Sequence, residues 1–258
     1  MKLGADKSSL GTRALVAAIA LISLSLFTWP LFIGAREQAQ SSLAQTVFML
    51  LMPLLVGLVL IEFSSGGIDA RQIALLGVLI ALNSVVRMLG AGTAGIETAF
   101  FLILIGAYAF GSAFGYVLGA GSLFVSALLT GGVGPWLPFQ MMAAGLLGLA
   151  AGALPHPTGK RAQIWVLIGF AVLGSFIYGA LMTLWNWPFL AGTGTSVSYL
   201  AGAGLVENLR RFVGFEVITG GLLWDAGRAI TTAVLVRLTA PALLATLHRA
   251  ARRAGYLR

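Results

Sequence analysis

The chain has 258 residues, of which 59% are apolar and only 9% are charged, and its mean hydropathy is +0.96. A soluble domain carries about a quarter charged residues, so this composition excludes an ordinary water-soluble protein. No charged side chain lies between Glu97 and Lys160, a stretch about three times the ~20 residues that one membrane-spanning helix needs. The chain also lacks the alternating pattern of about 10 residues that marks an outer-membrane barrel. We therefore predict an all-α polytopic membrane protein.

The net charge of +8 comes from 16 Lys and Arg residues. They gather at the ends of apolar segments and form no basic face, which indicates membrane topology and argues against a nucleic-acid partner. The sequence has no Cys, which excludes disulfides and cysteine-ligated metals. Its two histidines, His156 and His248, are far apart in the sequence. We expect no metal site and no cofactor.

Apolar runs divide the chain into eight predicted spans. The first follows Lys2, Lys7 and Arg13 as a signal peptide would, but it is longer than a typical signal-peptide core, so we expect it to be retained. Gly and Pro at 111–115 and 131–135 break the long charge-free stretch, because both disfavour helix. In chain order the predicted spans cover residues 14–33, 46–63, 73–89, 98–111, 115–130, 137–154, 163–184 and 222–247.

The cations favour one orientation of these spans. If the N-terminus is cytoplasmic, the Arg-rich C-terminal tail also lies inside, and only Arg36, Arg210 and Arg211 fall in outside segments. By the positive-inside rule we expect a multi-pass protein of the cell membrane with both termini in the cytoplasm.

The long external connection at 185–221 carries a mixed-charge run. We expect a short interfacial helix within 204–217, with Leu205, Leu209 and Phe212 near one face.

Motifs of enzyme chemistry are absent or lack their context. Gly90, Gly92 and Gly95 match G-x-G-x-x-G, but a predicted membrane span precedes them where a strand is required. The sequence contains no Walker-type, H-E-x-x-H or G-x-S-x-G motif. We expect no enzyme and no catalytic residues. A stand-alone secondary carrier is the main alternative, and a membrane enzyme or assembly factor is a further one; a carrier usually shows two related halves, which are not evident here.

Polar and aromatic residues gather near the predicted external ends of the later spans. Such groups are costly in a bilayer unless they are paired or face a cavity, so each is a candidate for substrate binding. For the Trp residues the alternative is an interfacial belt, for Arg87 snorkelling to the surface, and for Asp225 with Arg228 a local ion pair. The candidate substrate-binding residues are Asn83, Arg87, Glu97, Trp136, Phe139, Gln140, Tyr178, Trp185, Asp225 and Arg228.

Small residues recur at four-residue spacing on the third span. They are Ala70 and Ala74, followed by Gly77 and Ala81. Another helix can approach such a strip closely. The strip serves either internal packing or the docking of a partner subunit.

Five segments, most of them rich in Gly, carry a family resemblance: 74–83, 105–111, 131–140, 145–148 and 225–230. Together they resemble the substrate-binding S-components of energy-coupling factor (ECF) transporters. The resemblance implies a six-helix core at 67–258, preceded by an extra transmembrane hairpin at 1–66. It also implies a subunit that binds a vitamin from outside and works with a membrane T-component and two cytoplasmic ATPases, the T-component docking on the strip of small residues. Within the family, the segment 134–140 and the length of the external connection look most like the cobalamin-type group, and other vitamins such as riboflavin stay open.

Overall fold

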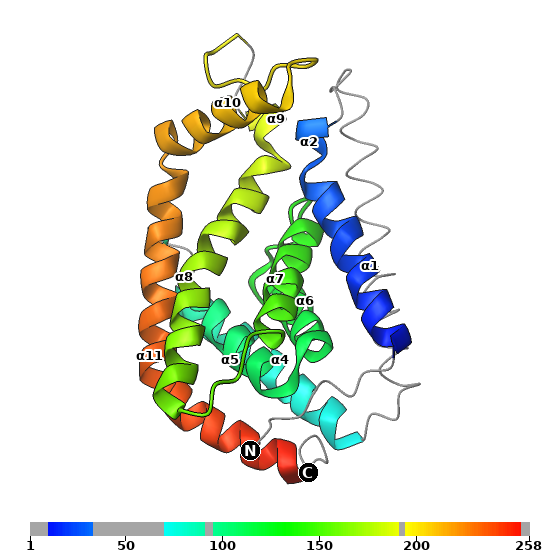
Figure 1. The fold of residues 1–258 in the computed structure, drawn as a ribbon, viewed down its shortest axis with the longest axis vertical. Coiled ribbons are helices and arrows are strands. Elements are labelled where there is room, and N and C mark those ends of the chain that lie inside the picture. Colours follow the sequence, from blue (N-terminus) through cyan, green and yellow to red (C-terminus); the bar gives the residue numbers. More distant parts are fainter. Residues whose placement is uncertain (1–9, 33–69, 91–94, 191–193, 254–258) are drawn as a thin grey trace.

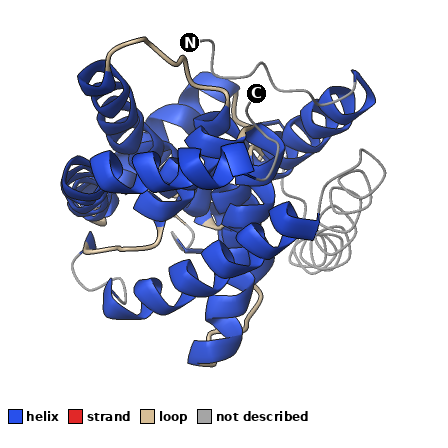
Figure 2. Ribbon diagram, turned by 90° about the horizontal axis from the view of Figure 1, so that it is seen from below, coloured by secondary structure: helices blue, strands red, loops and turns tan. Residues whose placement is uncertain are grey.

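The computed structural model describes residues 10–32, 70–90, 95–190 and 194–253, and every regular element in these ranges is a helix. This confirms the predicted all-helical membrane fold, and Figures 1 and 2 show the helices from two directions. The predicted span at 46–63 lies outside the described residues. The helices are α1 (Leu10–Phe27), α2 (Trp29–Phe32), α4 (Ala70–Gly90), α5 (Phe100–Phe110), α6 (Ser112–Thr130), α7 (Leu137–Gly152), α8 (Lys160–Leu184), α9 (Trp187–Leu190), α10 (Leu205–Ile218) and α11 (Gly221–Arg253).

Four of the described helices are long and apolar enough to cross a membrane. Their qualifying segments are Ile73–Gly90, Ser112–Thr130, Lys160–Leu184 and Gly221–Ala250. Helices α5 and α7 are shorter apolar helices. At 1.5 Å per residue, α5 is about half as long as the ~30 Å hydrocarbon core of a bilayer. Because every residue of α5 is buried, this helix lies inside the bundle, where it does not have to match the bilayer.

The helices form a bundle with one broad end. In Figure 1, α8 and α11 run side by side along one flank, α6 and α7 lie at the centre, and α1 lies on the other flank. Helices α2, α9 and α10 gather at the upper end, where α10 contacts α2. The beginning of α1 and the end of α11 both point toward the lower end.

Glycines separate α5 from α6 and allow the backbones of α6 and α7 to approach each other closely. Gly111 has a φ of 97°, a conformation that other residues rarely adopt, and it separates the two helices. Gly115 was also predicted to break a helix, and this is wrong because it lies inside α6. A Cβ at Gly115 would collide with the backbone of Gly148, and one at Gly119 with the backbone of Ala144. Helices α6 and α7 therefore touch backbone to backbone.

Helix α10 (Leu205–Ile218) forms where a short interfacial helix was expected, and Phe212 lies on the face that it packs against the protein. Leu205 and Leu209 are exposed, and of the three predicted residues only Phe212 is buried. The carboxamide of Asn208 accepts from the Leu200 N–H and donates to the Leu200 carbonyl, both at 3.1 Å. This pairing turns the Asn208 side of the helix toward the preceding loop. The buried residues of α10 are Asn208, Phe212, Phe215 and Glu216.

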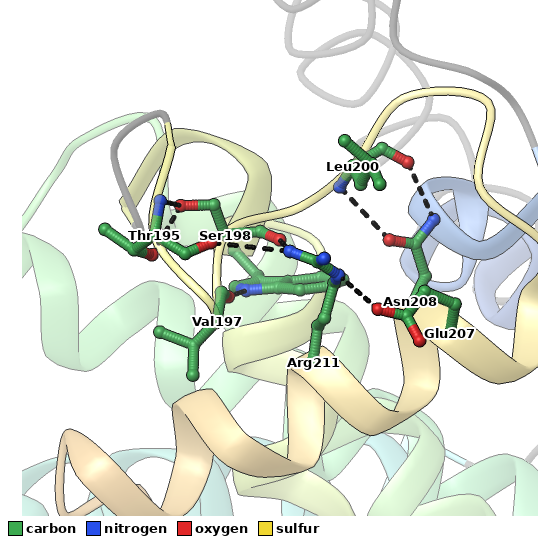
Figure 3. Close-up of polar contacts among 8 residues, drawn as sticks. Thr195, Val197, Ser198, Leu200, Glu207, Asn208 and Arg211 are labelled. Atoms are coloured by element: carbon green, nitrogen blue, oxygen red, sulfur yellow. Dashed lines mark hydrogen bonds and ion pairs between the residues drawn. The ribbon is translucent and has the colours of Figure 1, made fainter.

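The loop before α10 is held by side chains from both of its flanks, as Figure 3 shows. The buried Trp187 donates its indole N–H to the carbonyl of Val197 at 3.0 Å. Arg211 pairs with Glu207 at 2.7 Å and also donates to the carbonyls of Thr195 and Ser198, each at 3.4 Å. The described part of this connection is therefore a folded cap on the upper end of the bundle.

Candidate functional site

A buried ion cluster joins α11 to α8 and to the segment before α5. Its centre is Arg228, whose Nε donates to Oε2 of Glu97 at 2.8 Å. Nη1 donates to the carboxylate of Asp225, one turn earlier on α11, and to the carbonyl of Ser175 on α8 at 3.4 Å. The side chains of Arg228, Asp225 and Glu97 are only 8%, 5% and 12% exposed. Buried charges are tolerated when they are paired and hydrogen-bonded in this way.

Glycines allow these charges to come together. A Cβ at Gly179 on α8 would collide with the carboxylate of Asp225. Gly95 has a φ of 77°, and a Cβ there would collide with the carbonyl of Trp224 on α11. Only glycine lets the backbone approach this closely, so these two positions bring Asp225 against α8 and Glu97 against α11.

Two aromatic rings lie over the guanidinium group. The centroids of the Tyr178 and Phe100 rings are 5.0 Å and 5.8 Å from Cζ of Arg228. The two rings meet edge to face, with their centroids 4.6 Å apart. Both distances to the cation fall within the range of cation–π attraction. Carboxylates and aromatic faces together thus surround one planar cation.

Sequence reasoning missed Glu216, which lies at the same end of the bundle. It is only 4% exposed, and neither carboxylate oxygen has a hydrogen-bond partner among the described residues. Burial raises the pKa of Glu216, while the nearby Thr183 hydroxyl and the Arg228 charge act in the opposite direction. The signal in the sequence was its spacing: Glu216 follows Phe212 by four residues, which places the two side chains on the same face of α10.

Two predicted residues lie between α4 and α6. Arg87 donates to the hydroxyl of Ser126 at 3.0 Å, so it points into the bundle and does not snorkel outward. Asn83 is fully buried, and its amide nitrogen and oxygen have no partner in the described part of the chain. Next to it, Ser84 donates to the carbonyl of Ser122 at 3.0 Å. The polar residues of α4 thus face α6.

The predicted aromatic residues do not form one group. Phe139 on α7 stacks on Trp185 with ring centroids 3.5 Å apart and an angle of 9°, and Phe27 of α1 meets Phe139 edge-on at 5.8 Å. Trp136 is exposed and packs over Gly134, and Gln140 is half-buried in the first turn of α7. The ten candidates therefore fall into the ion cluster, the α4 pair, the aromatic stack and two outlying positions.

An apolar cavity of about 220 Å³ lies between α1, α7 and α8. Tyr178 borders both this cavity and the ion cluster, so it connects the two. Apart from the Tyr178 hydroxyl, the lining side chains are hydrocarbon or glycine. They include Leu24, Ala143, Leu147, Phe170 and Ile177.

The described residues thus form an all-helical membrane bundle with buried charges at one end. The model of the family described as ECF transporter, substrate-specific component, matches residues 71–245. The match covers well over half of the chain, so the protein belongs to this family of transporter subunits, which are not enzymes. Comparison with curated proteins and with solved structures gave no match.

Membership in this family implies a small-molecule substrate, a location in the membrane, and T-component and ATPase partners. The matched region begins within α4, so α1 and α2 lie before it. The division into a hairpin at 1–66 and a core at 67–258 stays a prediction.

Proposed function

We propose that the protein captures a vitamin on the external side of the membrane and delivers it with a T-component and two ATPases. The family match over residues 71–245 carries this proposal. The sequence has no Walker-type motif, so this chain does not supply such an ATPase itself, which agrees with a subunit that works with separate ATPases.

The substrate site is proposed at the end of the bundle that α10 caps. Glu97, Tyr178, Asp225 and Arg228 form the ion cluster there, and buried polar groups in a membrane protein are candidates for substrate contact. Asn83 and Arg87 extend the site along α4. Phe139, Trp185, Trp136 and Gln140 are proposed as its aromatic side, and a preference for cobalamin rests on the sequence of 134–140 alone.

The strip on α4 is proposed to dock the T-component. Ala74, Gly77 and Ala81 are all exposed, and a Cβ at Gly77 would meet nothing within 4 Å. The strip therefore does not serve packing inside the described bundle, which supports the docking alternative over internal packing. Ala70 begins the same helix, and its side chain lies outside the described residues.

Reconstitution into liposomes tests the proposed function. The purified chain should bind a vitamin but should not move it across the membrane, whereas the chain with its T-component and ATPases should accumulate it when ATP is supplied. Mass spectrometry of small molecules that co-purify with the chain should identify the vitamin. Transport by the chain alone, without ATP, would show a secondary carrier instead.

A further inference from the structure

The buried end of the α8–α11 interface carries more acidic than basic groups. Arg228 is shared by Glu97 and Asp225, which leaves Glu216 without an ion-pair partner in the described structure, with the Thr183 hydroxyl beside it. Two other arginines near this end are engaged elsewhere: Arg87 donates to Ser126, and Arg211 pairs with Glu207. Among the described ion pairs, none includes Glu216.

Glu216 lies in line with the ion cluster. Its Oε2 packs against Gly221, the first residue of α11. Gly221, Asp225 and Arg228 follow one another at one-turn spacing on one face of α11. Across from them, α8 presents Gly179 to Asp225 and Ser175 to Arg228, and Thr183, one turn after Gly179, lies beside Glu216. Glu216 thus lies one helical turn beyond Asp225, in the same row of charged side chains as Asp225 and Arg228.

An unpartnered carboxyl group is costly in this position, whichever form it takes. The ionised form needs a positive charge nearby, because removal of a lone carboxylate from water is highly unfavourable. The protonated form has the Thr183 hydroxyl beside it, but one hydroxyl cannot satisfy the whole carboxyl group, and an unsatisfied buried polar group costs about 1–3 kcal/mol. Native proteins rarely leave such groups unsatisfied. We therefore expect Glu216 to have a binding partner from outside the chain.

We infer that this partner is a positively charged nitrogen of the transported substrate, bound by Glu216 beside Asp225. The inference rests on the proposed function and adds the chemical class of the ligand. One turn below, the protein's own guanidinium is held by two carboxylates and two ring faces, which shows the same chemistry in use. An organic cation is favoured over a metal ion, because no group of three or more His, Asp or Glu in the described ranges is arranged to hold one.

Thermal unfolding of the purified full chain with charged and neutral probes tests the inference. The cationic probes are thiamine, choline and agmatine, and the comparison probes are riboflavin, cyanocobalamin and biotin. At millimolar concentration at least one cationic probe should raise the unfolding temperature of the wild type. Glu216→Gln keeps the size of the side chain and removes its charge, so it should weaken binding of that probe at least tenfold.

Glu207→Gln is the matched control. Glu207 lies on the same helix in an exposed pair with Arg211, and its removal should leave the affinity for the cationic probe within about twofold of the wild type. A wild type that responds only to neutral or anionic probes would overturn the inference, and so would equal affinities for wild type and Glu216→Gln. The comparison of cationic with neutral and anionic probes on the wild type tests the inference even if Glu216→Gln does not fold. In each of these cases uptake with the T-component and ATPases can still succeed, so failure of the inference is distinct from failure of the proposed function.

Discussion

At the scale of single residues, Gly179 decides whether the ion cluster can form. The Asp225 carboxylate occupies the space that a Cβ at this position would need. Gly179→Ala should displace Asp225 from Arg228, destabilise the protein by about 1–3 kcal/mol as overpacking does, and abolish substrate binding. Unfolding in detergent and a binding assay measure the two effects.

Gly169→Ala is the control on the same helix, because a Cβ there would meet nothing within 4 Å. Since Ala is the better helix former by about 0.5–1 kcal/mol, this control should be neutral or slightly stabilising. Equal effects of the two substitutions would mean that Asp225 does not pack against α8.

Glu216 should make the stability of the ligand-free protein depend on pH. Burial raises the pKa of this carboxyl in the folded state, so the folded state holds the proton more tightly than the unfolded chain. Its contribution to stability is therefore present at low pH and is lost as the pH rises through the folded-state pKa. Thermal unfolding across mildly acidic to neutral pH should show this decline, and Glu216→Gln should flatten it. A decline of the same size in Glu216→Gln would assign the pH dependence to another group.

The ion cluster could be predicted only in part from the sequence. Asp225 and Arg228 are three residues apart, so their pairing follows from helical spacing. Glu97 is 131 residues away from Arg228 in the chain, and no local pattern indicates that the two meet. Glu216 was missed because a charge in a mixed run suggests a solvated surface, although its four-residue spacing from Phe212 placed the two side chains on the same face.

At the scale of helices, spacing finds strips of small residues but does not say what covers them. The sequence drew attention to the strip on α4, whereas the close helix contact in the structure lies between Gly115 and Gly119 of α6 and Ala144 and Gly148 of α7. The two kinds of strip look alike in the sequence. In the structure they differ, because the α6–α7 strip has no room for a Cβ, whereas no described residue covers the α4 strip at Gly77.

The open strip on α4 predicts a separation of binding from transport. Gly77→Leu adds a side chain where no described atom lies within 4 Å of the Cβ position. The variant should therefore fold normally, and its affinity for the vitamin should stay within about twofold of the wild type. Close docking of another helix should be blocked, which should abolish co-purification with the T-component and uptake in cells.

Gly169→Leu makes the same change at an open position of α8 and should leave co-purification and uptake intact. Normal uptake by Gly77→Leu would mean that the T-component does not dock on the strip. Loss of vitamin binding in Gly77→Leu would instead mean that the strip contributes to internal packing.

At the scale of the whole molecule, the predicted spans anticipate the helices well because apolar length is a strong signal. Helices α4, α6, α7 and α8 begin and end within a few residues of the predicted limits. Helix α11 extends beyond its predicted end to Arg253, since polar and basic residues at a membrane surface do not stop a helix. The predicted limits of α5 lie within two residues of the observed ones. The sequence did not show that α5 is wholly buried, because an apolar run looks the same whether lipid or protein surrounds it.

The topology of the whole chain gives the last prediction. The start of α1 and the end of α11 point to the same end of the bundle, and α10 lies at the other end. Together with the excess of cations expected inside, this arrangement predicts that both termini are cytoplasmic and that the cap before α10 is external. The chain has no Cys, so single cysteines can be introduced as Leu3→Cys, Tyr256→Cys and Ser196→Cys without a background. In intact cells a membrane-impermeant maleimide should label only Ser196→Cys, an exposed position of the cap, and all three should react once the membrane is opened. Labelling of one terminal cysteine in intact cells would require an odd number of spans, and labelling of both would invert the protein and move the proposed substrate site to the cytoplasmic side.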